Sequence, residues 1–283
     1  MNKPKYIVCA TQRTGSFLLC NLLEHTGVAG MPQMPGGGYE ILDPFIGCDV
    51  TELDWNSIDL KQFLAGLFES RSGFKLLWKQ LVRLILDIQK TKRYKHITEK
   101  NIGSYFPEDV HFIYLARKNI LEQAASLLAM NLDDIIHSPV IEKERCIPAT
   151  LINKARLHGY IHSIKNNNHA WKRFFESNNI QPFEVEYEQF TQDLRGTVIA
   201  LLKHLEIPMP DNLIIKTDIA KQAGNEKKKI IKKYAGTPVV LLNTGLVFVN
   251  ILETAYKLSF ELRRHFPLYG RFLDSAKKKL QVK

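Results

Sequence analysis

A short apolar strand that runs through a small polar turn straight into an apolar helix restricts the fold of this chain most. The stretch extends from Tyr6 to Leu19 and reads YIVCATQRTGSFLL. In the turn from Thr11 to Gly15, successive backbone N–H groups can point inward, and the first N–H groups of a helix that begins near Ser16 lack an intrahelical partner. The positive end of the helix dipole adds to them. The pattern predicts an α/β domain with an anion site at this turn, and a phosphate is the expected anion.

The residues of the turn separate one phosphate chemistry from another. A Walker A loop has the pattern G-x-x-x-x-G-K-[ST], with a lysine directly after the second glycine. Here Ser16 follows Gly15, and Ala10 stands at the position of the first glycine. Arg13 is the cation of the loop, two residues before the glycine. This favours a donor with an isolated 5′-phosphate over a triphosphate with Mg²⁺. The simpler alternative is that the turn merely opens an α/β fold.

The alternation of apolar strands and amphipathic helices predicts one parallel sheet. Strands are expected at 6–10, 74–77, 111–115 and 183–187, and helices at 16–26, 59–70, 79–90, 120–130 and 197–205, with one or two more in 150–178. Arg117 follows the third of these strands, so a second cation lies at the carboxyl end of a strand, where open α/β sheets bind ligands. The alternative for Arg117 is a surface ion pair.

Length and charge are compatible with one large domain that binds an anion. The chain has 283 residues, of which 45% are hydrophobic. We expect one α/β domain over residues 1–236 and a basic, amphipathic helical extension over 237–283. The formal net charge of +10 suits an anionic ligand, but it equally suits nucleic acid or an acidic membrane surface. The extension is expected to pack against the same chain or across a homodimer, with peripheral membrane contact or a cover over the acceptor site as alternatives.

Cysteine spacing and the amino terminus bear on the compartment. Cys9, Cys20, Cys48 and Cys146 show no C-x-x-C spacing, so we expect reduced thiols and no disulfides. Only five apolar residues precede the polar turn, which is too short for a secretory signal. A cytoplasmic location is the expectation.

Several short motifs in a fixed order resemble a known family. The run ATQRTGSFLL is followed by TGVAG at 26–30, PQ at 32–33, FKLLWKQ at 74–80, FIYLAR at 112–117, QAAS at 123–126, AWKRFF at 170–175 and PFEVEY at 182–187. Together they resemble the trehalose 2-sulfotransferase-like family of bacterial sulfotransferases over roughly residues 5–235. The resemblance implies a P-loop-like, three-layer α/β fold. It also implies transfer of the sulfuryl group of 3′-phosphoadenosine-5′-phosphosulfate (PAPS) to a small acceptor without a metal.

The resemblance implies a role for several residues. The turn and the start of its helix would hold the 5′-phosphosulfate with Gln12, Arg13, Thr14, Gly15, Ser16 and Phe17. Arg117 and Ser126 stand in the relation that sulfotransferases use to hold the 3′-phosphate, through two parallel guanidinium N–H bonds and a hydroxyl. Lys75 either faces the transferred group or extends out of an edge strand. Lys227 lies in the basic segment where such enzymes close a loop over the nucleotide, and a solvated charge run is its alternative.

The sequence departs from the family at the general base. Related enzymes carry the motif GEPQE after TGVAG, and one of its glutamates is regarded as the base; here Met31 and Met34 replace both glutamates. One explanation is that the base has moved: Glu40 and Asp43 in the same glycine-rich loop are the nearest candidates, with Glu40 preferred, and His25 at the end of the first helix is a further one. The alternatives are that the acceptor needs no base or that the protein is inactive. The methionines also make trehalose an unsuitable acceptor, because they offer it no hydrogen bonds. Phe17 replaces the usual threonine, which predicts weaker donor binding.

Three function classes follow from these observations. The first is a sulfotransferase that acts on a hydroxyl, or on an amine or carbamoyl nitrogen, of a small molecule of secondary metabolism. The second is a P-loop kinase of a small metabolite, and the third is a noncatalytic nucleotide-binding relative. We expect no nucleic-acid partner. His158 and His162 have a spacing that zinc can use but no third ligand, and Trp171, Phe174 and Phe175 are expected in the core.

Overall fold

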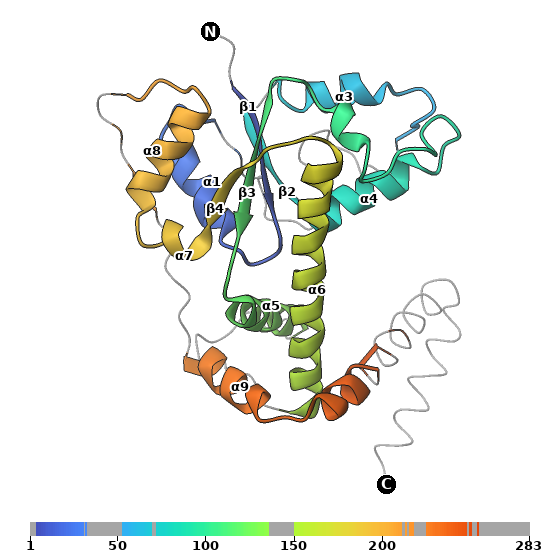
Figure 1. Ribbon diagram of the computed structural model, residues 1–283, viewed down its shortest axis with the longest axis vertical. Coiled ribbons are helices and arrows are strands. Elements are labelled where there is room, and N and C mark those ends of the chain that lie inside the picture. Colours follow the sequence, from blue (N-terminus) through green and yellow to red (C-terminus); the bar gives the residue numbers. More distant parts are fainter. Residues whose placement is uncertain are drawn as a thin grey trace, which may run out of the picture. The chain divides into compact units, whose positions relative to one another are not determined.

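The computed structural model describes residues 4–30, 32, 53–69, 72–135, 150–210, 213, 215–217, 225–247, 249–250 and 254. Four strands form its parallel sheet: β1 (Lys5–Ala10), β2 (Gly73–Leu77), β3 (Val110–Ala116) and β4 (Phe183–Glu186). Their order is β2-β1-β3-β4 (Figure 1). The central strand β1 pairs Val8 with Lys75 of β2 and with Ile113 of β3. The parallel pairing brings the carboxyl ends of all four strands to the same edge of the sheet.

Helices alternate with these strands, as the sequence predicts. They are α1 (Ser16–His25), α3 (Leu60–Gly66), α4 (Trp78–Ile88), the 3₁₀ turn η2 (Ile102–Tyr105), α5 (Ile120–Ile135), α6 (Leu151–Ser177), α7 (Tyr187–Phe190), α8 (Leu194–His204) and α9 (Asn225–Ala235). Each of the first three strands is followed by a helix that begins near its carboxyl end. The α/β class is thereby confirmed.

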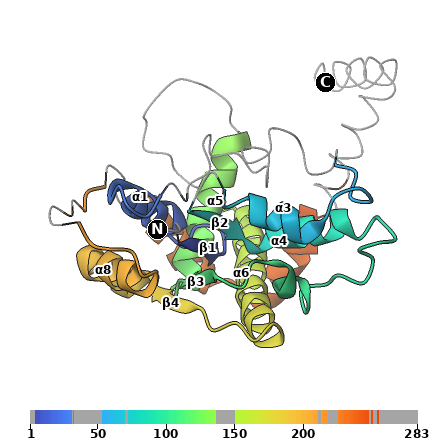
Figure 2. The ribbon, with the colours of Figure 1, turned by 90° about the horizontal axis from the view of Figure 1, so that it is seen from above.

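Helices lie on both faces of the sheet (Figure 2), and an apolar cluster fills each side. Ile7 and Cys9 of β1 belong to a core cluster with residues of α3, α4 and α6, which includes the buried Trp171. Tyr6 and Val8 alternate with them and belong to a second cluster with residues of α1 and α8. This alternation follows from the two-residue period of a strand. The result is the three-layer arrangement that the resemblance implies.

Most predicted boundaries lie close to the observed ones, but α5 continues to Ile135 instead of ending near 130, and α3 ends at Gly66 instead of near 70. The pattern at 150–178 is a single helix of 27 residues. The helix predicted at 197–205 begins earlier, at Leu194, because the Asp193 carboxylate accepts a hydrogen bond of 2.7 Å from the Gly196 N–H and caps it. Cys9 and Cys20 are buried, free thiols, as expected.

Two compact units divide the chain, Met1–Leu127 with Ile161–Ala223 and Leu128–Tyr160 with Gly224–Lys283. The first unit contains the sheet and the turn between β1 and α1. In the second, the ring nitrogens of His158 lie 2.8 Å from the Tyr234 hydroxyl and 3.0 Å from Asn243 Oδ1. The predicted domain boundary at residue 236 stays a prediction. None of the helices within the described ranges is long and apolar enough to cross a membrane.

Candidate functional site

The turn between β1 and α1 has a backbone shaped for an anion. Arg13 and Gly15 both adopt the left-handed region, with φ of 63° and 92°. The Thr14 hydroxyl donates to the Thr11 carbonyl at 3.0 Å and closes the turn. Within the described part of the chain, the backbone N–H groups of residues 14–18 have no protein acceptor. Such a run of unused N–H groups at a helix start binds phosphate or sulfate readily.

Helix α5 fixes the turn from one side. The buried side chain of Gln123 donates from Nε2 to the Thr11 hydroxyl at 2.9 Å and to the Gln12 carbonyl at 2.7 Å. One helical turn later, the Ser126 hydroxyl accepts a hydrogen bond of 3.1 Å from Arg13 Nε. Two residues that the sequence predicts for different phosphates, Arg13 and Ser126, are therefore in direct contact. The Ser126 O–H remains able to donate to a ligand.

Helix α6 fixes the turn from a second side. The Trp171 indole N–H donates to the Ala10 carbonyl at 2.9 Å, and the Thr11 hydroxyl donates to Asn168 Oδ1 at 3.2 Å. Trp171 is fully buried, which confirms its predicted place in the core. These contacts hold the last residue of β1 and the first residue of the turn before any ligand arrives. The anion site is thus largely preformed.

Lys75 delivers a second cation to the start of α1. Its ammonium lies 5.9 Å from the ring centroid of Phe17, and the Phe17 side chain is 52% exposed. Burial raises the pKa of the nearby Cys20 thiol to about 12, although the positive charge of Lys75 opposes this shift. Cys20 therefore remains a neutral thiol beside the site. Lys75 therefore lies near the first turn of α1.

Arg117 lies at the carboxyl end of β3, and its side chain is only 12% exposed. Its guanidinium carbon is 4.5 Å from the centroid of the Tyr187 ring. Nη2 forms an ion pair of 2.7 Å with Glu122, whereas Nε lies 3.8 Å from a carboxylate oxygen of Glu188. Among the described residues, nothing accepts a hydrogen bond from the buried Nε–H. The ion pair expected as the alternative for Arg117 is present, and an unused donor remains beside it.

Tyr187 joins Arg117 to the turn, a role that the sequence does not predict. A Cβ atom placed on Gly15 would lie 2.5 Å from two carbons of the Tyr187 ring. The same ring packs against Arg117. Tyr187 is the first residue after β4, at the edge where ligands bind in open α/β sheets. That position, at the end of the PFEVEY motif, is the sequence signal that could have identified it.

Glu188 ties the start of α7 to the turn after β3. Its carboxylate accepts hydrogen bonds of 3.0 Å from the backbone N–H groups of Lys118 and Asn119. Desolvation raises the pKa of Glu188, but the two N–H bonds and the positive charge of Arg117 together outweigh it and lower the pKa below its ordinary value. Glu188 is therefore held as a carboxylate next to Arg117.

Some residues predicted for the site lie elsewhere in the structure or outside the described residues. Glu40, Met31 and Met34 lie outside the described residues, as does the side chain of Lys227. His158 is engaged by Tyr234 and Asn243 in the second unit. Among the residues that the structure describes, no group of three or more His, Cys, Asp or Glu is placed to hold a metal ion.

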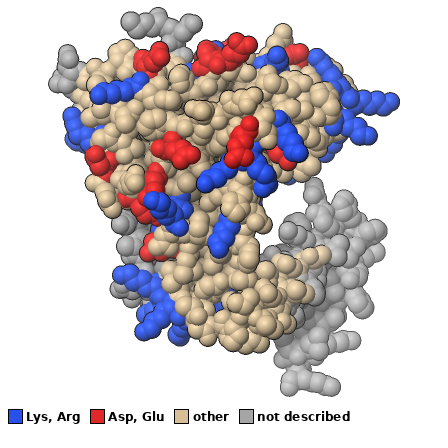
Figure 3. Space-filling view, in the orientation of Figure 1, with Lys and Arg blue, Asp and Glu red and all other residues tan. Residues whose placement is uncertain are grey.

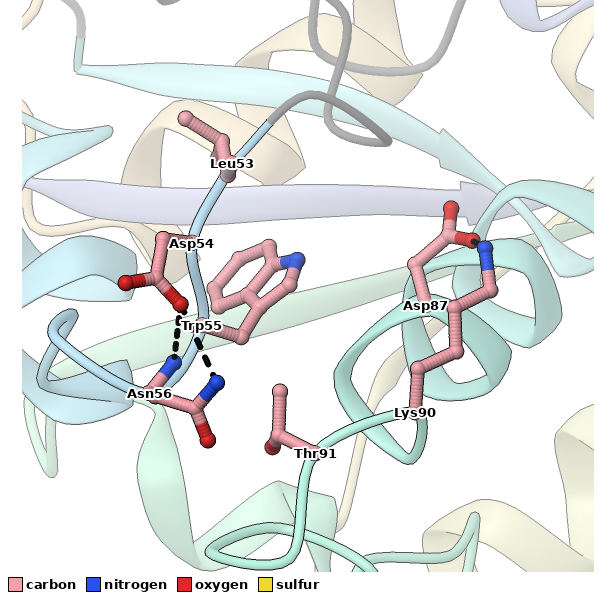
Figure 4. Close-up of a pocket in the computed structure, with 7 residues that line it drawn as sticks. All are labelled: Leu53, Asp54, Trp55, Asn56, Asp87, Lys90 and Thr91. Atoms are coloured by element: carbon pink, nitrogen blue, oxygen red, sulfur yellow. Dashed lines mark hydrogen bonds and ion pairs between the residues drawn. The ribbon is translucent and has the colours of Figure 1, made fainter.

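A separate pocket of about 180 Å³ lies between residues 53–56 and the end of α4 (Figure 4). Its buried Asp87 is engaged by Arg83 and Lys90, at 3.0 and 2.6 Å. The indole N–H of Trp55 is buried and has no partner among the described residues. None of the residues that line the pocket belongs to the β1–α1 turn or to α5. The pocket is distinct from the anion site and too small for a nucleotide.

Positive charge is dispersed on the face drawn in Figure 3. There, over the unit that carries the sheet, Lys and Arg alternate with Asp and Glu. A nucleic-acid site usually presents a continuous basic stripe or patch, and the described residues on this face do not form one. Near the β1–α1 turn, three cations are placed individually: Arg13 in the turn, Lys75 beside Phe17 and Arg117 against Tyr187.

The comparison with protein families agrees with this geometry. The family model described as Stf0 sulphotransferase matches residues 5–35 and 67–236. The matched segments contain the turn and also Lys75, Arg117, Ser126 and Tyr187. No curated protein matches the chain.

Proposed function

Because the chain belongs to the Stf0 sulphotransferase family, we propose that it transfers the sulfuryl group of PAPS to a small-molecule acceptor of secondary metabolism. In this reaction the S–O bond to the 5′-phosphate breaks and a bond from sulfur to the acceptor oxygen or nitrogen forms. Adenosine 3′,5′-bisphosphate leaves, and the acceptor proton passes to a base. An amine or carbamoyl nitrogen is an alternative to a hydroxyl as the attacking group.

The position of Tyr187 between Gly15 and Arg117 is the observation that supports this donor most strongly. The same ring lies close to Gly15 and packs against the guanidinium of Arg117. A ligand with two separate phosphates can therefore reach the N–H groups of the turn and Arg117 at once. A nucleotide with a 5′-phosphosulfate and a 3′-phosphate has this chemistry.

The residues of the turn fit the charge that develops during transfer. As the sulfuryl group departs, negative charge grows on the 5′-phosphate and its bridging oxygen, and donors fixed beforehand stabilise it without reorganising. The unused N–H groups of residues 14–18 and the guanidinium of Arg13 supply such donors. Lys75 approaches the same region from β2. Phe17 contributes its backbone N–H but no hydroxyl, which weakens binding of the donor.

Arg117 and Ser126 fit the 3′-phosphate. Arg117 offers an unused Nε–H and a second nitrogen, Nη2, on the same guanidinium. Ser126 adds a hydroxyl from α5, and its contact with Arg13 couples the two phosphate sites. Charge-assisted hydrogen bonds of this kind are stronger than neutral ones.

We assign the general base to Glu40, in the loop where the family glutamates are replaced by Met31 and Met34. Glu40→Gln would then abolish sulfuryl transfer and leave nucleotide binding unchanged. The acceptor is a small molecule with a nucleophilic oxygen or nitrogen. A cytoplasmic location, the lack of a nucleic-acid partner and a homodimer through residues 237–283 remain predictions.

Calorimetric titration with adenosine 3′,5′-bisphosphate in EDTA tests this function, with ATP plus Mg²⁺ as the comparison. We expect metal-independent binding of the bisphosphate that Arg117→Ala weakens by about 10- to 100-fold. Arg173→Ala is the matched control, because Arg173 is an exposed arginine on α6 of the same unit. Preference for ATP with Mg²⁺ would point to the kinase, and binding of neither ligand would contradict a PAPS-dependent function.

A further inference from the structure

Two carboxylates flank Arg117, and the structure holds them very differently. Glu122 pairs with Nη2 at 2.7 Å, and its side chain is 53% exposed. Glu188 lies 3.8 Å from Nε, and its side chain is 32% exposed. That longer distance is an electrostatic contact without a hydrogen bond. The two partners of Arg117 therefore differ in solvent access and in the type of contact.

Glu188 is fixed by the backbone. Each of its carboxylate oxygens accepts one N–H, from Lys118 and from Asn119, at 3.0 Å. Moving Glu188 would leave both N–H groups without an acceptor. Glu188 thus contributes a fixed negative charge beside Arg117 and holds the turn after β3 in place. A ligand anion would not displace it.

Glu122 is free to move. It lies in the first turn of α5, and its backbone N–H is capped by the Asn119 side chain at 3.0 Å. Within the described residues, Arg117 is the partner that its carboxylate contacts. The Glu122 carboxylate is half exposed, so water solvates it when it leaves Arg117. The guanidinium is only 12% exposed, so another anion has to take the place of Glu122. Tyr187 and Glu188 keep the guanidinium oriented during this exchange.

We propose that Glu122 is the exchangeable counter-ion of Arg117 and sets how strongly the site selects a nucleotide with a 3′-phosphate. The inference rests on the proposed function. A 3′-phosphate displaces the Glu122 carboxylate from Nη2 and also supplies the acceptor that Nε lacks. A nucleotide without a 3′-phosphate leaves the Arg117–Glu122 pair intact and gains nothing from Arg117.

The exchange has a consequence for turnover. The donor and the departing bisphosphate carry the same 3′-phosphate, so the site holds the product with the contacts that hold the donor. Glu122 competes with that phosphate for Arg117 and repels it, which lowers affinity for both. Weaker product binding speeds release, a step that limits many enzymes.

The test compares the affinities of adenosine 3′,5′-bisphosphate and adenosine 5′-monophosphate in EDTA for wild type and Glu122→Gln. We expect the variant to bind the bisphosphate about three- to tenfold more tightly and the monophosphate with unchanged affinity. Glu176→Gln is the matched control, because it removes one negative charge at an exposed position of α6. It should change neither affinity.

A double-mutant cycle shows whether the effect acts through Arg117. In the Arg117→Ala background, Glu122→Gln should no longer strengthen bisphosphate binding. An equal gain for both nucleotides, or a gain that persists without Arg117, would show a general charge effect and overturn the proposal. Unchanged or weaker bisphosphate binding by Glu122→Gln would also overturn it. If wild type itself shows no preference for the bisphosphate, both the proposed function and this inference fail.

Discussion

At the scale of single residues, the site depends on a glycine that has both an unusual backbone and a close neighbour. Gly15 has a φ of 92°, and a Cβ there would lie 2.5 Å from ring carbons of Tyr187. We expect Gly15→Ala to lower the free energy of unfolding by about 1–3 kcal/mol, because it combines backbone strain with a forced shift of the ring. Bisphosphate binding should weaken as well. Urea unfolding and calorimetry measure the two effects.

Gly66→Ala provides the control for Gly15→Ala. Gly66 is the last residue of α3, and a Cβ there would meet nothing within 4 Å. Alanine should be neutral at this position, or stabilising by about 0.5–1 kcal/mol. Equal effects of the two substitutions would contradict the close packing of Tyr187 on the turn.

The thiol of Cys20 gives a second test at this scale. Burial raises its pKa to about 12, so the thiolate that reacts with alkylating reagents is scarce at about pH 8. We expect iodoacetamide to leave Cys20 unmodified in the folded protein and to modify it after unfolding in urea. Mass spectrometry of peptides measures both. Rapid alkylation of Cys20 in the folded protein would contradict its burial on α1.

Individual site residues were predictable from the sequence where they stand in a recognisable motif. Arg13, Arg117 and Ser126 were predicted, and the structure places all three around one turn, although their contacts with phosphate stay predictions. The contact of Tyr187 with Gly15 was missed, because it depends on how α7 follows β4 beside the turn. Gln123 was missed for the same reason, since its two hydrogen bonds reach residues more than a hundred positions away.

At the scale of elements, two turns at the carboxyl edge of the sheet act together. Glu188 at the start of α7 accepts two N–H groups from the turn between β3 and α5. Beyond the end of the β3–β4 ladder, this carboxylate and the ion pair of 2.5 Å between Lys118 and Glu186 link the two segments. The link holds Arg117 in place, because Arg117 precedes Lys118 directly.

The link predicts a pH-dependent loss of stability. The folded-state pKa of Glu188 is lowered, so its contribution is fully present above the ordinary pKa of 4.5 and is lost as pH falls through the lower folded value. We expect Glu188→Gln to have a lower Tm than wild type at neutral pH. The difference should shrink as the pH falls below 4.5. Calorimetric Tm values at matched pH measure this, and a difference that stays constant with pH would contradict the role of the charge.

The elements themselves were largely predictable from apolar periodicity. The four strands and the starts of the helices after β1, β2 and β3 were predicted closely, because their apolar patterns are strong and bounded by turn residues. The end of α5 was predicted at 130 instead of Ile135, and the lysine-rich α9 was not predicted as a helix. The start of α8 was predicted three residues too late, because Leu194 is followed by Arg195 and Gly196, which interrupt the apolar pattern, and the turn depends on the Asp193 cap. The short α7 was missed, since four residues are too few to show a helical period.

At the scale of the whole molecule, the net charge of +10 attracts anions in general, and this attraction adds to the affinity of the proposed bisphosphate site. We expect bisphosphate affinity to fall severalfold between about 0.05 M and 0.5 M salt, because exposed charges are screened within about 10 Å at 0.1 M. Glu176→Gln should show the same salt dependence as wild type. Calorimetry across salt concentrations measures this, and affinity that is independent of salt would contradict a charge-based site.

The central claim is that one nucleotide spans the turn at Gly15 and the guanidinium of Arg117. The most direct test is the ratio of the dissociation constants of adenosine 5′-monophosphate and adenosine 3′,5′-bisphosphate in EDTA, for wild type and Arg117→Ala. We predict that wild type prefers the bisphosphate by about 10- to 100-fold and that the variant loses this preference but still binds the monophosphate. Equal affinities in wild type, or a preference that survives in Arg117→Ala, would contradict it.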